Sequence, residues 1–402
     1  MNKKIKVPQF SKDIVAKNLR DGYWIEAADI DQNKQVDLFG YGFGMGEIYW
    51  YKNPTWEKYL IADKVKMPCG ADYADITKNG YPDIIFCYQL YGEGGTIHDP
   101  DQEGGKIDWI ENPGKNNHDQ SQWKRHYIGK TTGMHRVRAG YFTQHERLEI
   151  LGFPIITANN KHGLLPVVMF TQPDDPKKEW PMTVVDNSNF RMIHGAEKKA
   201  GLIKGSNLDS MILASDEGIT WFYFDEKQNK WQRVLIGEGE LSQFEISGYK
   251  GSGDVDIGAI KNDKFAYVAA IEPFHGNTVA VYYKDKANSW KRSVLDVFGD
   301  LNQNGEGPGH QVLCADFDGD GEDEFLVGLR GPWPWQGVFY YKAIDIENGV
   351  FTKWRVSDES VARIAIADFK QRGKIDFATI AYAVPKYYVA KDAKVVVHSN
   401  QM

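Results

Sequence analysis

The chain has 402 residues, 42% of them hydrophobic, and its 55 acidic residues outnumber the 48 Lys and Arg, which gives a net charge of −7. This composition allows a large buried core, and no basic stripe of the kind that binds nucleic acid is visible. No apolar run reaches the ~18 residues that a membrane-spanning helix needs. We therefore expect a soluble protein without a signal peptide, either cytoplasmic or the mature form of an exported protein.

The residue types favour many short strands. The chain contains 12 Trp, 21 Tyr and 20 Phe, and 40 Gly lie between them, as expected for strands joined by tight turns. The three cysteines, Cys69, Cys87 and Cys314, lack the spacing of a zinc knuckle, so we expect buried, reduced thiols.

Two patterns alternate along the chain after a first predicted strand at residues 10–15. One is a strand that runs into an acidic turn and then a second apolar strand. Such turns are expected at 29–37, 75–83, 141–149, 200–209, 249–255, 316–324 and 368–376. The other is a Trp that opens an outer strand, with copies at Trp56, Trp123, Trp180, Trp231, Trp290 and Trp354.

This alternation predicts an all-β fold, a seven-bladed β-propeller of four-stranded blades that occupies residues 1–402 as one domain. Seven turns but six Trp strands leave one outer strand missing. Because the chain ends in a third strand near residues 395–398, we expect the strand at 10–15 to complete the last blade and close the ring.

Three of the acidic turns have the layout of a cation-binding loop. In the sixth turn the oxygen ligands would be Asp316, Asp318, Asp320 and Glu324. In the first turn they would be Asp29, Asp31, Asn33 and Asp37, and the second turn is a weaker copy. This spacing suits Ca²⁺ or Mg²⁺, and such loops resemble the FG-GAP or VCBS repeats of integrin-like propellers. The alternative is that Asp, Asn and Gly form turns by capping backbone amides, without a metal.

Counting six residues back from each turn gives the start of the innermost strand, which lines the central channel. The positions are Tyr23, Cys69, His135, His194, Gln243, His310 and Ala362. Histidines grouped in this way can hold Zn²⁺ or a similar ion, or can act as acid and base near neutral pH. The alternative is that these side chains are polar only because water fills the channel.

Further polar and aromatic residues are expected at the same mouth. Trp24, Arg136, Arg138, Gln311 and Arg363 neighbour the ring positions. Three insertions could cover a substrate and stack on a sugar ring. They contain His98, His275, and the pair Trp333 and Trp335.

Several of these segments resemble the propeller domain of the fungal aldos-2-ulose dehydratases, also called 1,5-anhydro-D-fructose dehydratases. The similar motifs are Gly22–Ala27, Met45–Tyr51, Glu272–Asn277, Gly307–Gln311 and Gly331–Gly337. The resemblance implies a carbon–oxygen lyase that removes water from an oxidised sugar, with a central histidine as base and a bound divalent metal. By motif, His135 would be that base, and His310 and His275 would be site residues.

Elimination next to a carbonyl needs a base, stabilisation of the enolate and help for the leaving oxygen. We expect His135 to be the base, a metal or Arg136 and Arg363 to stabilise the enolate, and Tyr23 or His310 to assist the leaving group. His194 would be a metal ligand. The residues expected to bind substrate are His98, His275, Trp24, Gln311, Trp333 and Trp335.

Two other functions remain open at this point. One is a polysaccharide or oligosaccharide lyase that cleaves at a uronic acid, with the channel arginines neutralising the carboxylate. The other is a non-catalytic carbohydrate-binding propeller, since such folds are often scaffolds. All three readings expect a carbohydrate ligand, no organic cofactor, and no nucleic-acid or membrane partner.

Overall fold

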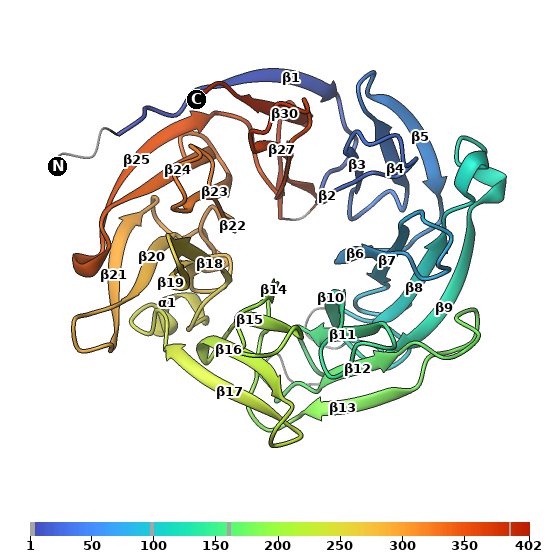
Figure 1. Ribbon diagram of the computed structural model, residues 1–402, viewed down its shortest axis with the longest axis horizontal. Coiled ribbons are helices and arrows are strands. Elements are labelled where there is room, and N and C mark those ends of the chain that lie inside the picture. Colours follow the sequence, from blue (N-terminus) through green and yellow to red (C-terminus); the bar gives the residue numbers. More distant parts are fainter. Residues whose placement is uncertain (1–4, 97–99, 159–161, 386) are drawn as a thin grey trace.

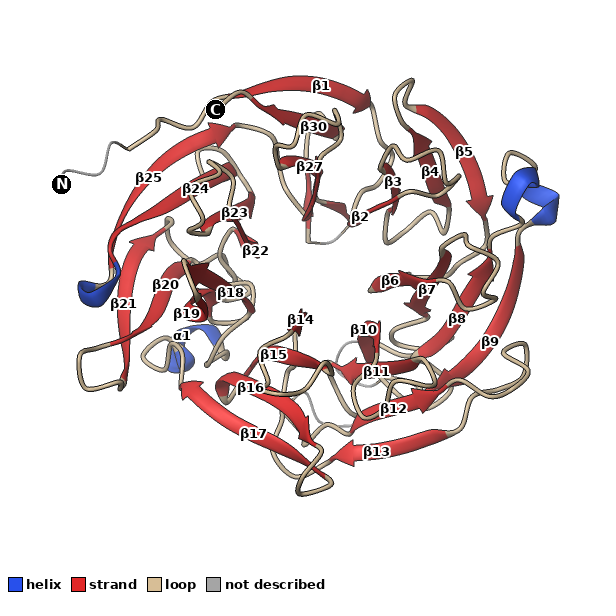
Figure 2. Cartoon of the chain, in the orientation of Figure 1, coloured by secondary structure: helices blue, strands red, loops and turns tan. Residues whose placement is uncertain are grey.

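The computed structural model describes residues 5–96, 100–158, 162–385 and 387–402. Over these residues, seven four-stranded antiparallel sheets surround a central channel (Figure 1). Figure 2 shows that strands make up nearly all of the regular structure and that helices are confined to short segments between them. The predicted seven-bladed, all-β propeller is therefore confirmed.

Six blades are each built from four consecutive strands, ordered from the channel to the rim. Blade 1 contains β2 (Trp24–Ala28), β3 (Asp37–Tyr41), β4 (Ile48–Lys52) and β5 (Glu57–Ala62). Blade 2 contains β6 (Ala71–Ala74), β7 (Asp83–Tyr88), β8 (Lys106–Glu111) and β9 (Lys124–Lys130). Blade 3 contains β10 (Met134–Gly140), β11 (Glu149–Pro154), β12 (Val167–Thr171) and β13 (Met182–Asp186).

The next three blades repeat this order. Blade 4 contains β14 (Gly195–Ala200), β15 (Asp209–Ser215), β16 (Gly218–Asp225) and β17 (Lys230–Gly237). Blade 5 contains β18 (Asp254–Ile260), β19 (Asp263–Glu272), β20 (Thr278–Lys284) and β21 (Trp290–Val297). Blade 6 contains β22 (Gly309–Ala315), β23 (Glu324–Arg330), β24 (Gln336–Asp345) and β25 (Val350–Ser357).

The last blade combines both ends of the chain. From the channel outward it contains β26 (Arg363–Ala367), β27 (Asp376–Ile380), β30 (Val395–Asn400) and β1 (Phe10–Ala16). Strand β1 pairs antiparallel with β30, with Phe10 opposite Asn400. The predicted closure by the N-terminal strand is thus confirmed, and it covers the edge that β30 would otherwise expose.

Short elements decorate the loops. A hairpin of β28 (Ala383–Val384) and β29 (Tyr388–Val389) lies between β27 and β30. The helical segments are η1 (Gly114–Asn116), η2 (Gln120–Gln122), η3 (Ile346–Asn348) and α1 (Phe244–Ser247). None of the described helices has the length and apolar character that crossing a bilayer requires.

Large buried aromatic side chains pack on rings of the adjacent strand in the same blade. Trp50 and Trp109 are fully buried and pack on Tyr59 and His126, with ring centroids 4.8 and 4.4 Å apart. Burial of such rings supplies much of the stabilisation of a core. The three cysteines are free and buried, as predicted.

The acidic turns cap backbone amides. In blade 1, the Asp29 carboxylate accepts hydrogen bonds from the amides of Asn33 and Lys34 at 3.0 and 2.9 Å. The first acidic residue of the turns in blades 2, 6 and 7 accepts the equivalent pair. These contacts are the ones expected from good turn formers, whether or not a metal binds.

One predicted turn is wrong. The first two strands of blade 5 are joined by the short reversal from Ile260 to Asp263, not by residues 249–255. The channel position of this blade is therefore Gly253, and Gln243 instead precedes α1, outside the ring. The count failed because only two residues, Lys261 and Asn262, separate these strands, whereas the turns of the other blades are longer.

Candidate functional site

Four histidines meet at one end of the channel. The ring centroid of His194 lies 5.1 Å from that of His135 and 5.6 Å from that of His310. His275, from the loop between β19 and β20, completes the group at 4.8 Å from His194 and 5.1 Å from His310. The inner strands of blades 3, 4 and 6 supply three of these rings because their equivalent positions face the same axis.

Hydrogen bonds fix the tautomers of two rings. His194 donates from Nδ1 to the Gly253 carbonyl at 2.7 Å, and His310 donates from Nδ1 to the Ala362 carbonyl. A neutral imidazole carries one N–H, so Nε2 of each ring keeps its lone pair. The buried Nε2 of His310 has no hydrogen-bond partner within the part of the chain that the structure describes.

His135 is engaged differently. Its Nε2 lies 3.1 Å from the Tyr23 hydroxyl and 2.8 Å from Nη1 of Arg136. Because a guanidinium only donates, Nε2 must be the acceptor and Nδ1 must carry the proton. Nη2 of Arg136 also approaches Nε2 of His194 at 3.3 Å. Arg136 therefore connects the rings of His135 and His194 through its two terminal nitrogens.

The histidines are neutral at physiological pH. Burial, with the Arg136 guanidinium second, lowers the pKa of His135 and of His194 well below the usual value. Burial, with His275 second, does the same for His310. Burial and then Arg330 lower the pKa of His275 to about 4. Neutral imidazoles can accept a proton or ligate a metal.

Two residues behind His275 were not predicted from the sequence. Arg330, at the end of β23, donates from Nη2 to the Glu306 carboxylate at 2.7 Å. Both groups also reach Nδ1 of His275, at 3.3 Å for Arg330 Nη1 and 3.5 Å for Glu306 Oε2. Burial alone would raise the pKa of Glu306, but its interactions with His275 and Arg330 lower it to about 2. The only sequence signal was position, since these residues directly precede two of the motifs quoted above.

An aromatic funnel opens above the histidines. Its wall is mostly apolar, and its polar atoms come from His135, His194, His275 and the hydroxyls of four tyrosines, Tyr23 among them. The aromatic and aliphatic residues that line it are Phe43, Leu90, Tyr91, Ile155, Ile156, Met192, Phe274, Tyr382, Val384 and Tyr387. Such a wall suits the apolar faces of a sugar ring.

Several predicted residues lie beneath this funnel instead of lining it. Trp24 and Arg363 are almost fully buried, and the Arg363 guanidinium lies 4.4 Å from the Trp24 ring centroid. Gln311 is also buried, and its side-chain oxygen accepts the backbone amide of Ile364. None of the three is among the described residues of the funnel wall, so their expected substrate contacts are not found. Each follows a ring position by one residue and turns into the next layer of the channel.

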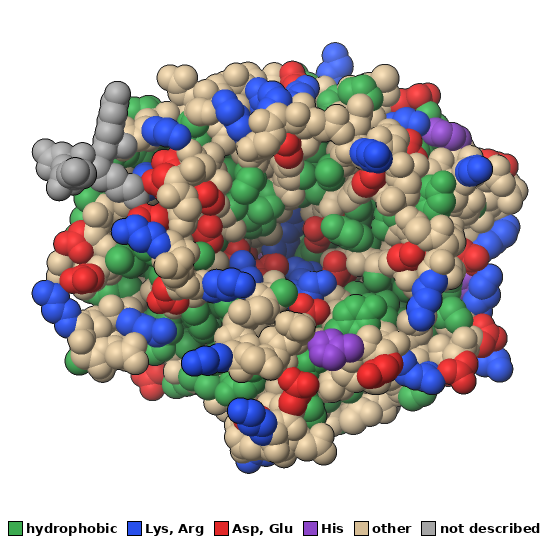
Figure 3. All heavy atoms as spheres, viewed as in Figure 1, with side chains coloured by type: hydrophobic (Ala, Val, Ile, Leu, Met, Phe, Trp, Pro, Cys, Tyr) green, Lys and Arg blue, Asp and Glu red, His purple; other side chains and the backbone are tan. Residues whose placement is uncertain are grey.

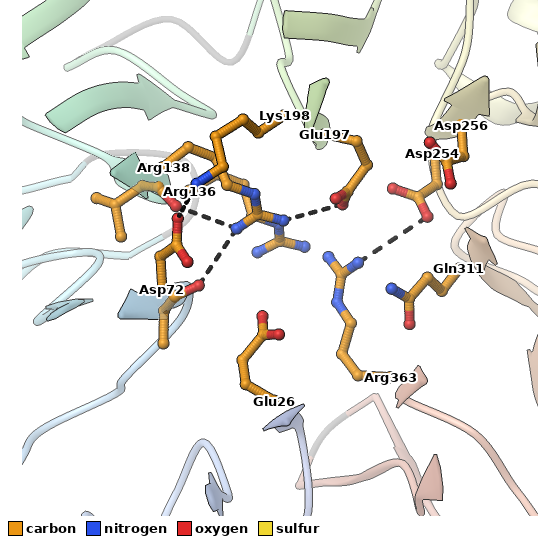
Figure 4. Close-up of polar contacts among 12 residues, drawn as sticks. Glu26, Asp72, Arg136, Arg138, Glu197, Lys198, Asp254, Asp256, Gln311 and Arg363 are labelled. Carbon is orange, nitrogen blue, oxygen red and sulfur yellow. Dashed lines mark hydrogen bonds and ion pairs between the residues drawn. The ribbon is translucent and has the colours of Figure 1, made fainter. Parts of the chain in front are cut away.

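Farther along the channel lies a layer of paired charges (Figure 4). Arg138 donates to Glu197 at 2.9 Å, and Lys198 lies 3.7 Å from Asp72. Glu26 shares this layer, and burial raises its pKa to about 8. Figure 3 shows the opposite face of the propeller from the funnel, with acidic and basic side chains gathered in a central hollow.

The predicted covering loops are only partly at the site. His275 is part of it, whereas His98 lies outside the described residues. Trp333 is 61% exposed and stacks under the Arg355 guanidinium at 4.9 Å, and Trp335 packs on Phe298. Neither Trp lines the funnel among the described residues, because their loop packs against the outer part of blade 6.

Two groups of acidic residues could hold a cation. The carboxylates of Asp29, Asp31 and Asp37 lie within 4.8 Å of one another, as do those of Asp316, Asp318 and Asp320. In the second group the ammonium of Lys342, from β24, approaches Asp318, Asp320 and Glu324 at 2.8, 3.0 and 2.6 Å. A positive charge is thus already supplied there by the chain itself.

The histidines form a third group that fits a metal. Ligand atoms of His194, His275 and His310 lie within 4.8 Å of one another. The unpartnered lone pair on His310 Nε2 and the donor set of three imidazoles suit Zn²⁺ or a similar ion. His135 is not part of this group. Its acceptor nitrogen instead lies within hydrogen-bond distance of Tyr23 and Arg136.

Comparison with known proteins relates the chain to one enzyme family. Residues 104–285 match a family described as the β-propeller domain of aldos-2-ulose dehydratase. The aldos-2-ulose dehydratase of Phanerodontia chrysosporium is 37% identical over 416 residues, which cover 95% of this chain and 45% of that protein. The chain therefore spans less than half the length of this relative.

A solved structure supports the fold. It is described as BBS1N in complex with ARL6DN, has a TM-score of 0.56 and is 10% identical. The match covers 97% of this chain and 96% of that one, and at this identity it bears on architecture alone. From the family match and the relative together, the chain is similar over almost its whole length to the β-propeller domain of the aldos-2-ulose dehydratases.

Proposed function

We propose that this chain is a carbon–oxygen lyase that removes water from a keto-sugar, such as an aldos-2-ulose or 1,5-anhydrofructose, by β-elimination in the funnel. The observation that carries the proposal is a group of four neutral imidazoles, three of which line the floor of an aromatic funnel while the fourth, His310, packs against them. The name of the relative from Phanerodontia chrysosporium supports the same reaction class.

The funnel wall favours a neutral sugar over a uronate. Among the described residues of that wall none is Arg or Lys, and Arg136 and Arg363 are buried beneath it. A uronate carboxylate placed there would lack an Arg or Lys partner, so that only the metal ion proposed below could offset its charge in a site shielded from water. Dehydration of a monosaccharide is therefore preferred to cleavage of a uronate-containing glycan.

The four histidines and Tyr23 divide into two functional sets. His194, His275 and His310 would hold a divalent metal ion, which polarises a carbonyl oxygen when bound. His135 and Tyr23 would handle protons. We assign no direct substrate contact to Arg136, which orients His135 and His194 through its hydrogen bonds.

The hydrogen bond between Tyr23 and His135 accounts for both proton steps. Nε2 of His135 takes the proton from the carbon next to the carbonyl, and the electron pair of the C–H bond forms the C=C bond. The hydroxyl on the following carbon leaves as water with the proton of the Tyr23 hydroxyl. The protonated Nε2 then returns its proton to the Tyr23 oxygen across the 3.1 Å contact, which restores both groups.

The test uses the variant His135→Gln, with His145→Gln in an exposed turn as the matched control. With 1,5-anhydrofructose or glucosone, the wild type and the control should produce the ultraviolet absorbance of a conjugated enone. His135→Gln should lower the rate by about 100- to 10,000-fold, the usual contribution of a general base. Chelation of metal should also stop the reaction. Retained turnover in His135→Gln would remove this residue from the mechanism.

A further inference from the structure

A buried ion pair lies directly behind His275. The side chains of Glu306 and Arg330 are 6% and 3% exposed, and their closest charged atoms are 2.7 Å apart. Such pairs add little net stability, because desolvation offsets their attraction. Stability alone therefore does not explain why two charges are buried next to a histidine of the site.

The backbone around His275 is also constrained. His275 has a φ of +43°, a left-handed conformation that is unfavourable for a residue with a side chain. Its carbonyl accepts the amide of Gly307, and the Gly307 carbonyl accepts Nε and Nη2 of Arg330. The loop that carries His275 and the segment that carries Glu306 are thus held together through Arg330.

The two charged groups make opposite demands on Nδ1 of His275. The Glu306 carboxylate only accepts, so it favours a proton on Nδ1, whereas the Arg330 guanidinium only donates, so it favours a lone pair there. A proton on Nδ1 leaves the lone pair of Nε2 facing the funnel. A lone pair on Nδ1 would instead put the proton on Nε2, where it would block both metal ligation and proton acceptance.

Arg330 has other acceptors for its donors. It binds Glu306 and the Gly307 carbonyl, and its Nη1 also reaches the Tyr382 hydroxyl at 3.4 Å. Glu306 is the acidic group within ion-pair distance of His275 among the described residues. The Arg330 contact with Nδ1 is the shorter of the two, but Arg330 can direct its donors to these other acceptors, whereas a proton on Nδ1 has the Glu306 carboxylate as its acceptor. This balance favours the tautomer with the proton on Nδ1.

We propose that Glu306, held in place by Arg330, is a positioning residue that keeps the proton of His275 on Nδ1 and presents the Nε2 lone pair to the funnel. The proposed tautomer of His275 does not depend on the proposed function. Only the use of its Nε2 lone pair, in metal binding or proton transfer, rests on that function. Carboxylates behind ligating histidines commonly fix the tautomer in this way.

The tautomer can be observed directly in metal-free protein labelled with ¹⁵N-histidine. Nuclear magnetic resonance distinguishes protonated from unprotonated ring nitrogens, and His275→Asn identifies the signals of His275. The wild type should show His275 protonated on Nδ1. In Glu306→Gln the proton should move toward Nε2, because the neutral amide competes poorly with Arg330. Competition with a chromophoric chelator should then show Zn²⁺ binding weakened by about 10- to 100-fold.

Glu111→Gln is the matched control. Glu111 lies 2.8 Å from Nε2 of His126, in an equivalent carboxylate–histidine pair away from the funnel. This variant should change the signals of His126 and leave those of His275 and the affinity for Zn²⁺ unchanged. If Glu306→Gln does not fold, the wild-type spectrum alone decides the matter.

Two results would overturn the inference. One is a wild-type His275 protonated on Nε2, and the other is an unchanged tautomer and Zn²⁺ affinity in folded Glu306→Gln. Failure of the proposed function appears separately, as a wild type that has the stated tautomer but dehydrates no keto-sugar.

Discussion

At the funnel end of the channel, His135, His194 and His310 are buried without charge, and two of their ring nitrogens lack a hydrogen-bond partner within the described part of the chain. At the other end, charges are kept and paired, as in Arg138 with Glu197. The same inner strands carry both layers, so the backbone is not what distinguishes them. Neutral imidazoles with an available lone pair can handle a ligand or a proton, whereas paired charges mark structural contacts.

The largest effect expected on the charged face comes from Lys342, which is buried among three carboxylates in the turn of blade 6. Lys342→Ala would leave these carboxylates uncompensated and should lower the free energy of unfolding by about 3–5 kcal/mol. Added Ca²⁺ should recover part of the loss, because carboxylate oxygens suit that ion. Urea denaturation measures both. The control Lys353→Ala removes an exposed lysine and should cost less than about 1 kcal/mol. An equally small loss in Lys342→Ala would show that the buried charges do not stabilise the fold.

A second comparison sets a paired against a poorly paired guanidinium. Arg138→Met breaks the contact with Glu197, which is 21% exposed, and should cost about 2 kcal/mol. The nearest carboxylate oxygen to Arg363 is 3.9 Å away, on Asp254, and Nε and Nη2 have no partner among the described residues. Arg363→Met should therefore change stability by less than about 1 kcal/mol. If Arg363→Met proved more destabilising than Arg138→Met in denaturation experiments, the distinction between the paired and the poorly paired guanidinium would be refuted.

The two ends should also respond to pH in opposite directions. The folded state holds the pKa of His275 at about 4, below the usual 6.5, so its contribution to stability is present above about pH 6.5 and is lost as the pH falls toward 4. The folded state raises the pKa of Glu26 from 4.5 to about 8, so its contribution is present below about pH 4.5 and is lost as the pH rises through 8.

Glu26→Gln isolates the second of these effects. Between about pH 5 and about pH 9, the free energy of unfolding should fall by about 1–2 kcal/mol less in the variant than in the wild type. The expected difference is no larger because water reaches the half-buried carboxyl and screens its charge. Unfolding curves at both pH values measure it. Parallel pH profiles for the variant and the wild type would show that Glu26 titrates normally.

The smallest effect is expected at the rim. Trp333→Ala removes an exposed side chain outside the funnel and should change KM and kcat by less than about twofold. A large rise in KM would mean that the loop at residues 331–337 moves over the substrate, and would restore the role first expected for it.

Most of the fold could be predicted from the sequence because each blade repeats the same turn and the same outer strand. The repeat also brought His135, His194 and His310 together, since equivalent positions in different blades share one axis. Blade 5 was misread because its first two strands are joined by only two residues, Lys261 and Asn262, in place of the longer turn of the other blades.

The rest of the site could not be predicted because it does not follow the repeat. Glu306 and Arg330 are 24 positions apart and meet through contacts between two loops. Trp24 and Gln311 were misplaced because neighbouring residues of a strand point to different sides, which turns them away from the funnel.

The pairing of β1 with β30 has a consequence for synthesis. On the ribosome, residues 10–16 emerge well before their partner strand, which ends at residue 400. At the usual rate of ~5–20 residues per second, this segment waits roughly 20–80 s for its partner. During that interval blades 1 to 6 can assemble as an open arc, and the synthesis of β30 then allows the arc to close into a ring.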